Sequence, residues 1–302
     1  MKEYEYTGKA MGTDFSISIV SDSKDLADKI AKESIIEIDK YEKEFSRFLS
    51  ESELSKLNYR KEMLVSETFI KVIEEAYKLY VITNGIFNPL VQIERFGYDR
   101  DFPKINYNYK IEEKDYDIDF SSVIIDKKEN RIILRVGQKL DFGGFLKGYL
   151  AEFICKKIKS QSENIKGVIV NIGGDIHTQG LDESSNKFIF NIYNPVTQKD
   201  DISIPLYNQS LATSGIYKRN WKINNTKIHH ILDASGKRNP ISDIISVSII
   251  HENGGKSEAY TKVFLSIGPE EALKSLKDDS IKFVIIKKDG QIIDNCIECL
   301  CR

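Results

Sequence analysis

The sequence lacks the features that mark several large classes of protein. No apolar run reaches the roughly 18 residues that a membrane-spanning helix needs, so no membrane span is predicted. The net charge of −2 leaves no basic excess, which argues against a nucleic-acid partner. The N-terminal Met1–Tyr6 has no apolar core of a signal peptide. We therefore expect a cytoplasmic protein, or an extracytoplasmic one whose signal or lipoprotein segment has been removed.

Cysteine and histidine are scarce, with four of each in 302 residues. Cys155 falls in a predicted helix and is typical of a small buried hydrophobe. Cys296, Cys299 and Cys301 form a C-x2-C-x-C tail. Thiolates at that spacing can share a soft metal ion, but no fourth ligand is evident, so loose or oxidisable thiols are the alternative. The H-E-x-x-H, G-x-S-x-G and P-loop motifs are absent.

Two polar turns, residues 141–152 and 171–177, each carry a pair of adjacent glycines. Glycine lets a ligand approach the backbone closely. The first turn opens a predicted helix, and a helix N-terminus presents unpaired N–H groups and a partial positive charge. Lys147 adds a point charge, and Asp175 follows the second glycine pair. We predict a phosphate-binding turn at residues 141–152.

The periodicity of apolar residues indicates an α+β fold in one domain over residues 1–302. Helices are expected at 23–44, 50–58, 66–83, 144–160, 256–267 and 270–277. Strands are expected at 4–20, 121–126, 130–136, 167–172, 187–193, 202–206, 244–251, 281–287 and 291–294, with a hairpin over 222–233 that turns at 224–225. Because strands and helices mix without strict alternation, mixed sheets with packed helices are favoured over a doubly wound sheet. Residues 96–120, rich in Tyr, Asp, Lys and Asn, are interpreted as a surface insertion.

Several positions leave alternatives open. Met11–Thr13 interrupts the first strand, either as a bend where backbone contacts a ligand or as a simple irregularity. Phe87, just past a helix end, is either a core residue or a plane for an aromatic ligand. Adjacent strand residues face opposite sides, so only one of His229 and His230 can face a given site, and His230 is the candidate base. Thr213–Gly215 either provides a nucleophile or forms a tight loop.

Several segments, in this order and spacing, together resemble the FAD:protein FMN transferases, the ApbE-like flavin transferases. They are Met11–Thr13, Phe45–Ser46 with Ser50–Asn58, Thr83–Pro89, Asp141–Gly148, Asn171–Ile176, Ala212–Gly215 and His229–Asp233. The resemblance implies a T-fold-like α+β architecture that binds one FAD. It also implies a divalent metal ion, usually Mg²⁺, and transfer of FMN to a Thr or Ser of a partner flavoprotein with release of AMP. Some members of this family hydrolyse FAD instead.

The resemblance also implies roles for particular residues. His230 matches the base that activates the acceptor hydroxyl, and Gly144 matches a position whose carbonyl contacts the metal ion. Asp175 is a further cofactor-binding candidate, because it directly follows the second glycine pair. The positions that match flavin-nucleotide contacts are Met11, Phe48, Ile86, Phe87, Asn88, Asp141, Lys147 and Leu232.

One segment departs from the family pattern. Where relatives have Ala-Asp-x-x-x-Thr, with Asp and Thr as metal ligands, this chain has Ser257–Lys262. Glu258 replaces the Asp as a longer hard-oxygen ligand, and Lys262 replaces the Thr but cannot ligate a metal while protonated. Residues four apart share a helix face, so we expect Lys262 to point at the metal position and to pair with Glu258. Shifting the alignment by one residue would offer Thr261 as the metal ligand, but Thr261 does not have the spacing of four from Glu258 that places two residues on one helix face.

Two hypotheses follow from this departure. In the first, the Lys262 ammonium substitutes catalytically for the charge of the metal ion; in the second, the site binds flavin without efficient transfer. Three functions therefore remain: a transferase of FMN from FAD, a non-catalytic flavin carrier or sensor, and a hydrolase that cuts FAD to FMN and AMP.

Overall fold

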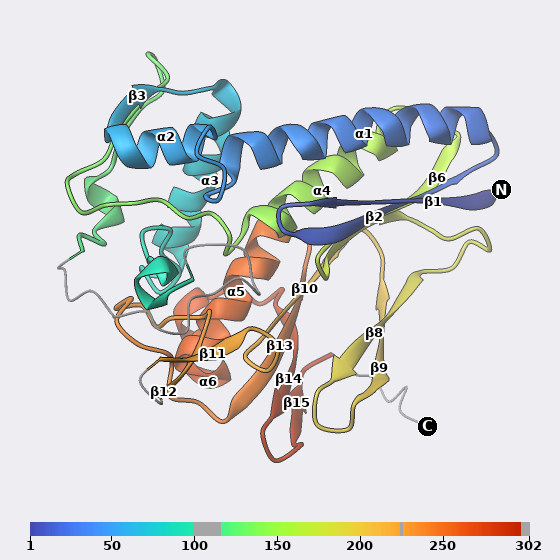
Figure 1. Ribbon diagram of the computed structural model, residues 1–302. Coiled ribbons are helices and arrows are strands. Elements are labelled where there is room, and N and C mark those ends of the chain that lie inside the picture. The colour runs from blue at the N-terminus through green and yellow to red at the C-terminus, as the bar shows by residue number, and fades with distance from the viewer. Residues whose placement is uncertain (99–115, 224–225, 297–302) are drawn as a thin grey trace.

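The computed structural model describes residues 1–98, 116–223 and 226–296, and it has the α+β architecture that the sequence predicts (Figure 1). Its main sheet has eight antiparallel strands in the order β1-β2-β6-β7-β10-β13-β14-β15. These strands are β1 (Lys2–Ala10), β2 (Thr13–Ser21), β6 (Ile165–Ile172), β7 (Asp175–Gly180), β10 (Ser210–Gly215), β13 (Ile244–His251), β14 (Lys282–Lys287) and β15 (Ile292–Asp294).

Helices cover one face of this sheet. Helix α1 (Lys24–Phe45) packs on β1 and β2, α4 (Leu146–Lys159) on β6 and β7, and α5 (Gly254–Ile267) on β10 and β13. Figure 1 shows α1 running above β1 and β2. Helices α2 (Glu53–Arg60), α3 (Glu67–Ile82) and α6 (Pro269–Leu276) complete the helical part of the described chain. Smaller sheets pair β3 (Glu62–Leu64) and β4 (Ile124–Asp126) with β5 (Arg131–Ile133), β8 (Phe188–Asn194) with β9 (Lys199–Leu206), and β11 (Asn220–Ile223) with β12 (Thr226–His229).

Local sequence signals explain where the helices begin. Ser23, Ser52, Ser66 and Asn253 each cap a helix, because their side-chain oxygens accept a hydrogen bond from a backbone N–H of the first turn. The helices predicted from periodicity are confirmed to within a few residues. Within the described chain, no helix has both the length and the apolar character needed to cross a membrane.

One prediction about the strands is wrong, and one open alternative is decided. Residues 4–20 are not one strand with a bend. Met11 and Gly12 both have positive φ, 55° and 69°, and form a tight hairpin turn between β1 and β2. Thr213–Gly215, for which a tight loop was one alternative, belong to β10, an interior strand of the main sheet. Small residues suit β10 because α5 packs directly against it.

Most of the predicted insertion, residues 99–115, lies outside the described residues. Phe96, Tyr98 and Phe120 at its two ends are buried. Cys155 is buried in α4, as predicted. The tail prediction cannot be compared with the structure, since Cys299 and Cys301 also lie outside the described residues. The turn predicted at 224–225 lies outside them too, although β11 and β12 pair as the predicted hairpin.

Candidate active site

A cavity of about 340 Å³ opens between the helical part of the chain and the β11–β12 hairpin. Its wall comes from the β1–β2 turn, the end of α1, the turn after α3, the start of α4, the segment after β12, and α5. Most of the predicted site residues line it, namely Met11, Phe48, Ile86, Phe87, Asn88, Asp141, Gly144, Lys147, His230, Leu232 and Lys262. Asp175 and Glu258 lie behind Lys147 and are not part of the lining.

One end of the cavity is aromatic and apolar. The Arg47 guanidinium lies over the rings of Phe48 and Tyr98, 4.2 and 4.8 Å from their centroids. Phe87 is a core residue whose ring packs edge-on against Phe145, and it also lines the cavity. The side chain of Asn88 is engaged by two backbone groups, since it donates to the Ile118 carbonyl and accepts from the Leu90 N–H. This end suits a planar, partly apolar ligand.

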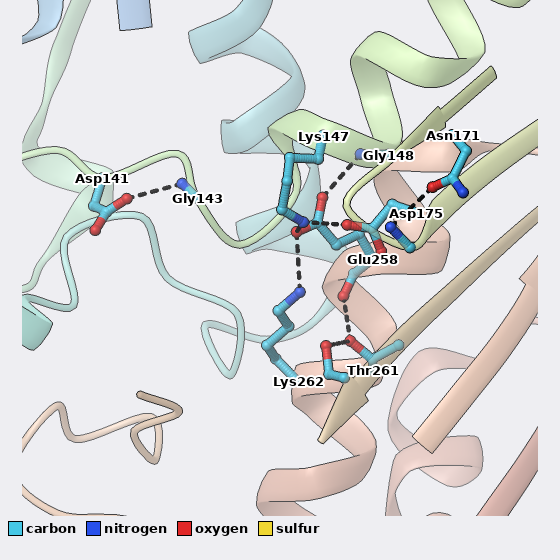
Figure 2. Close-up of polar contacts among 11 residues, drawn as sticks. Asp141, Gly143, Lys147, Gly148, Asn171, Asp175, Glu258, Thr261 and Lys262 are labelled. Carbon is cyan, nitrogen blue, oxygen red and sulfur yellow. Dashed lines mark hydrogen bonds and ion pairs between the residues drawn. The ribbon is translucent and has the colours of Figure 1, made fainter. Parts of the chain in front are cut away.

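The first glycine turn leads into α4. Asp141 holds the turn, because its carboxylate accepts a hydrogen bond from the Gly143 N–H at 2.8 Å (Figure 2) and also pairs with Arg47 at 3.2 Å. A Cβ at Gly144 would lie 2.9 Å from the Phe87 ring, so the close packing of this turn requires glycine there. Helix α4 has no side-chain N-cap, and its N-terminus meets the cavity. The N–H groups of Gly143 and Gly148 are already bonded to carboxylates and that of Leu146 to a carbonyl, so the anion-binding turn stays a prediction that depends on Lys147 and the positive end of α4.

Four charged side chains meet beneath this turn, as Figure 2 shows. Lys147 Nζ pairs with Asp175 and lies 2.8 Å from Glu258 Oε1. Lys262 Nζ lies 3.2 Å from the same oxygen, which confirms the predicted pairing of Lys262 with Glu258. The other oxygen, Glu258 Oε2, accepts from the Gly148 N–H at 2.9 Å. Both carboxylates are buried, whereas each lysine side chain is 20% exposed and lines the cavity.

Burial and neighbouring charges act in opposition within this cluster. Burial disfavours the charge of Lys147, but Asp175 and Glu258 outweigh it and raise its pKa. Burial and repulsion from Glu258 raise the pKa of Asp175 to about 6. The pKa of Glu258 is lowered because the two ammonium groups outweigh its burial. Burial, together with repulsion from Lys147, lowers the pKa of Lys262.

The donor set does not fit the divalent metal ion that the family resemblance implies at Gly144 and Glu258. No group of three or more His, Cys, Asp or Glu side chains in the described part of the chain could hold a metal ion. Both oxygens of Glu258 are engaged by ammonium and N–H donors. Thr261 is buried, and its hydroxyl bonds to the Glu258 carbonyl and to Ser214, so a shifted register does not supply a ligand. Hard cations require free oxygen ligands, and neither buried carboxylate of this cluster is without a donor from the protein.

His230 lines the cavity as a neutral imidazole. Its Nδ1 lies 3.3 Å from the Arg219 carbonyl, which can only accept, so Nδ1 carries the proton and Nε2 keeps a lone pair. Burial, and repulsion from Arg219 and Lys262, lower the pKa of His230 to about 3. His229 does not line the cavity and instead contacts Asn239. The expectation that only one of the two histidines faces the site is confirmed.

The second glycine pair and the small-residue segment do not line this cavity. Gly173 and Gly174, with φ of 64° and 96°, form the tight turn between β6 and β7. Their role is indirect, since this turn places Asp175 beneath Lys147. The Thr213 hydroxyl bonds to Ser248, so neither Thr213 nor Ser214 is presented to the cavity as a nucleophile.

The lining residues that were not predicted include Glu42, Arg47 and Arg219. Glu42 accepts a hydrogen bond from the Met11 N–H at 2.7 Å, which joins α1 to the β1–β2 turn. Arg47 lies between two aromatic residues in Phe45–Phe48, and this pattern in the sequence could have indicated that Arg47 belongs to the site. Glu42 and Arg219 carried no such signal, because their contacts are with segments distant in the sequence.

The fold and the site together define an α+β protein with a cavity lined by aromatic and positively charged side chains. The chain belongs to the ApbE family, whose sequence profile matches residues 11–285. Among curated relatives, the FAD:protein FMN transferase of Klebsiella pneumoniae is 23% identical over 305 aligned positions, covering 96% of this chain and 91% of the relative. The enzyme of the same name from Salmonella typhimurium is 20% identical, covering 94% and 84%.

Solved structures show the same fold. The crystal structure of the ApbE protein from Thermotoga maritima superposes with a TM-score of 0.83 at 23% identity, covering 97% of both chains. The apo flavinyl transferase ApbE of Pseudomonas stutzeri gives a TM-score of 0.76 at 16% identity, covering 97% of this chain and 94% of that one. The predicted ApbE-like α+β architecture is confirmed.

Proposed function

We propose that this chain is an FAD:protein FMN transferase, which moves FMN from FAD to a Thr or Ser hydroxyl of a partner flavoprotein and releases AMP. The curated relatives that have this name align with nearly the whole chain. One observation carries the proposal for this chain: a neutral histidine, His230, shares a cavity with two ammonium groups, Lys147 and Lys262. That combination suits substitution at a phosphate, because the histidine can act as a general base and the ammonium groups can neutralise the phosphate charge.

The chemical character of the cavity wall supports one orientation of FAD. The aromatic end, with Phe48 and Tyr98, suits a ring system of the dinucleotide. The glycine turn and the start of α4 suit the pyrophosphate, because Lys147 and the positive end of the α4 dipole favour an anion there. Met11, Ile86 and Leu232 supply apolar contact in the same cavity.

The transfer is a phosphoryl substitution without redox change. The acceptor hydroxyl oxygen attacks the phosphorus on the FMN side of the pyrophosphate, and a new P–O bond forms. The bond from that phosphorus to the bridging oxygen breaks, and its electron pair leaves with AMP. His230 Nε2 takes the hydroxyl proton, while the Nδ1–H bond to the Arg219 carbonyl holds the imidazole in the required tautomer. The ammonium groups of Lys147 and Lys262 stabilise the charge that develops on the phosphate oxygens.

The proposal is tested by incubating the protein with FAD and an acceptor flavoprotein domain and measuring the intact mass of the acceptor. The expected result is a gain of one FMN group and release of one AMP. The control acceptor carries Ala or Val in place of its target Thr or Ser. Bound FAD with no AMP in any buffer would instead identify a carrier or sensor. AMP release without labelling of the acceptor would identify an FAD hydrolase.

A further inference from the structure

The positive charge at the phosphate end of the cavity is built into the chain. Lys147 from α4 and Lys262 from α5 both converge on Glu258 Oε1, at 2.8 and 3.2 Å (Figure 2). Both lysine side chains line the cavity, whereas the carboxylates of Glu258 and Asp175 are buried and lie outside its lining. The cluster therefore has its positive residues at the ligand cavity and its negative residues in the protein interior.

The geometry points to Lys262 as a tethered cation that occupies the place of a metal ion in this site. On this basis the pyrophosphate of FAD is neutralised by Lys147 and Lys262, and neither FAD binding nor FMN transfer needs a divalent ion. This inference rests on the proposed function, because it names the groups that hold the phosphates in the same cavity. It concerns binding and charge only, and the bonds formed and broken are those given above.

The contacts of Glu258 explain why a divalent ion is excluded. An ion at this carboxylate would have to displace the Lys262 ammonium at 3.2 Å and the Gly148 N–H at 2.9 Å. It would also stand close to Lys147, whose like charge repels it. The remaining buried carboxylate, Asp175, is paired with Lys147. Every carboxylate of the cluster is thus committed to a donor within the protein.

The pairing also orients Lys262. Lys262 lies one helical turn after Glu258 on α5, so the ion pair directs its side chain along the helix face that meets α4. The side chain lines the cavity and is 20% exposed, and Glu258 Oε1 takes one of the three N–H donors of the ammonium, so donors remain for a phosphate oxygen. A threonine at this position would present a short neutral hydroxyl instead.

The experiment measures Mn²⁺ binding and FAD affinity separately. Mn²⁺ is titrated into the wild type, with and without ADP, and bound ion is followed by electron paramagnetic resonance. FAD and riboflavin affinities are measured by flavin fluorescence in EDTA and in Mg²⁺. The wild type is expected to hold no stoichiometric Mn²⁺ and to bind FAD equally in both buffers.

Variants of Lys262 then test whether this residue is responsible for FAD binding without a divalent ion. Lys262→Met is expected to weaken FAD binding in EDTA by roughly 10- to 100-fold, because a hydrogen bond to a charged group is lost. Riboflavin, which has no phosphate, should bind as it does to the wild type. Lys262→Arg keeps the charge and should bind FAD within a few-fold. The matched control is Lys256→Met on the same helix, which removes the partly exposed ion pair with Asp278 outside the cavity.

The double variant Glu258→Asp with Lys262→Thr supplies the converse test. It is expected to gain a Mn²⁺ site and to bind FAD more tightly in Mg²⁺ than in EDTA. Stoichiometric Mn²⁺ binding to the wild type, or FMN transfer that stops in EDTA, would overturn the inference while leaving the proposed function intact. Equal FAD affinity of the wild type and Lys262→Met would overturn it too. A wild type that binds no FAD in either buffer would overturn the proposed function and this inference together.

Discussion

Gly148 of α4 and Gly254 of α5 bring the two helices into direct backbone contact. A Cβ on either glycine would overlap the carbonyl oxygen of the other. This crossing sets the distance between Lys147 and Glu258, which lie next to Gly148 and one turn after Gly254. The charge cluster of the site therefore depends on two residues that carry no side chain.

Gly148→Ala is expected to separate the two helices and to destabilise the fold by roughly 1–3 kcal/mol, as for other overpacked cores. FAD affinity should fall with it, since Lys147 moves away from Glu258. Urea unfolding and flavin fluorescence check both effects. Gly255→Ala is the control, because a Cβ there meets nothing closer than 3.5 Å. Equal stabilities of the two variants would contradict the role given to the crossing.

Glu258→Gln removes a buried negative charge that holds two ammonium groups in place. Breaking one partner of a buried pair costs roughly 3–5 kcal/mol, because the remaining charges are left uncompensated. We expect a loss of that size in the free energy of unfolding measured with urea. Glu271→Gln breaks an ion pair with Lys274 whose side chains are 65% and 69% exposed, and it should cost no more than about 1 kcal/mol.

His230→Asn is expected to lower the rate of FMN transfer by roughly 10²- to 10⁴-fold, the range for loss of a general base. FAD affinity should change only a few-fold, because the imidazole is assigned to the acceptor hydroxyl. Single-turnover kinetics and flavin fluorescence separate the two effects. His229→Asn is the neighbouring control, since His229 does not line the cavity. A loss of affinity as large as the loss of rate would argue for a binding role instead.

The pH profile gives an independent check on His230. Its pKa, lowered to about 3 by burial, leaves Nε2 unprotonated at every pH above that value. The transfer rate should therefore not fall through imidazole protonation between pH 8 and pH 5. A rate that drops with a midpoint near 6.5, the ordinary histidine value, would show that the imidazole titrates normally in the complex.

His177, which lies outside the cavity, is one of the buried histidines that should make stability fall in mild acid. Burial, aided by Lys156, lowers its pKa from 6.5 to about 3. Between these values the unfolded chain binds more protons than the folded one, so stability is lost as pH falls, by up to about 1.4 kcal/mol per pH unit for one group. Asp175, with its pKa raised from 3.8 to about 6, acts in the opposite direction over its own range.

His177→Asn isolates this contribution. The variant should lose less stability than the wild type between pH 7 and pH 4.5, as measured by urea unfolding at each pH. Its absolute stability at pH 7 is expected to be lower, because the His177 hydrogen-bonding contact with Ser210 at 2.6 Å is altered. Parallel profiles for the two proteins would show that another group controls the acid response.

Local features of the sequence were sufficient to predict the helices, most strands and many lining residues of the cavity. Apolar periodicity and serine caps act within a few residues, so the sequence determines them directly. The spacing of four between Glu258 and Lys262 likewise predicted their ion pair. The sequence pattern around Met11, by contrast, did not distinguish a bend from a hairpin turn, because both require the same glycine.

Only the tertiary structure decided how these segments meet. Lys147 and Glu258 are separated by 111 positions in the chain, and only the crossing of α4 and α5 at Gly148 brings them together. The same is true of β10. Its small residues are typical of a loop, and only the packing of α5 against them shows that they form an interior strand. Periodicity is a property of one segment, whereas burial and charge compensation belong to pairs of segments. For that reason the sequence indicated that Lys262 replaces a metal ligand, and only the packing showed that both oxygens of Glu258 are already engaged.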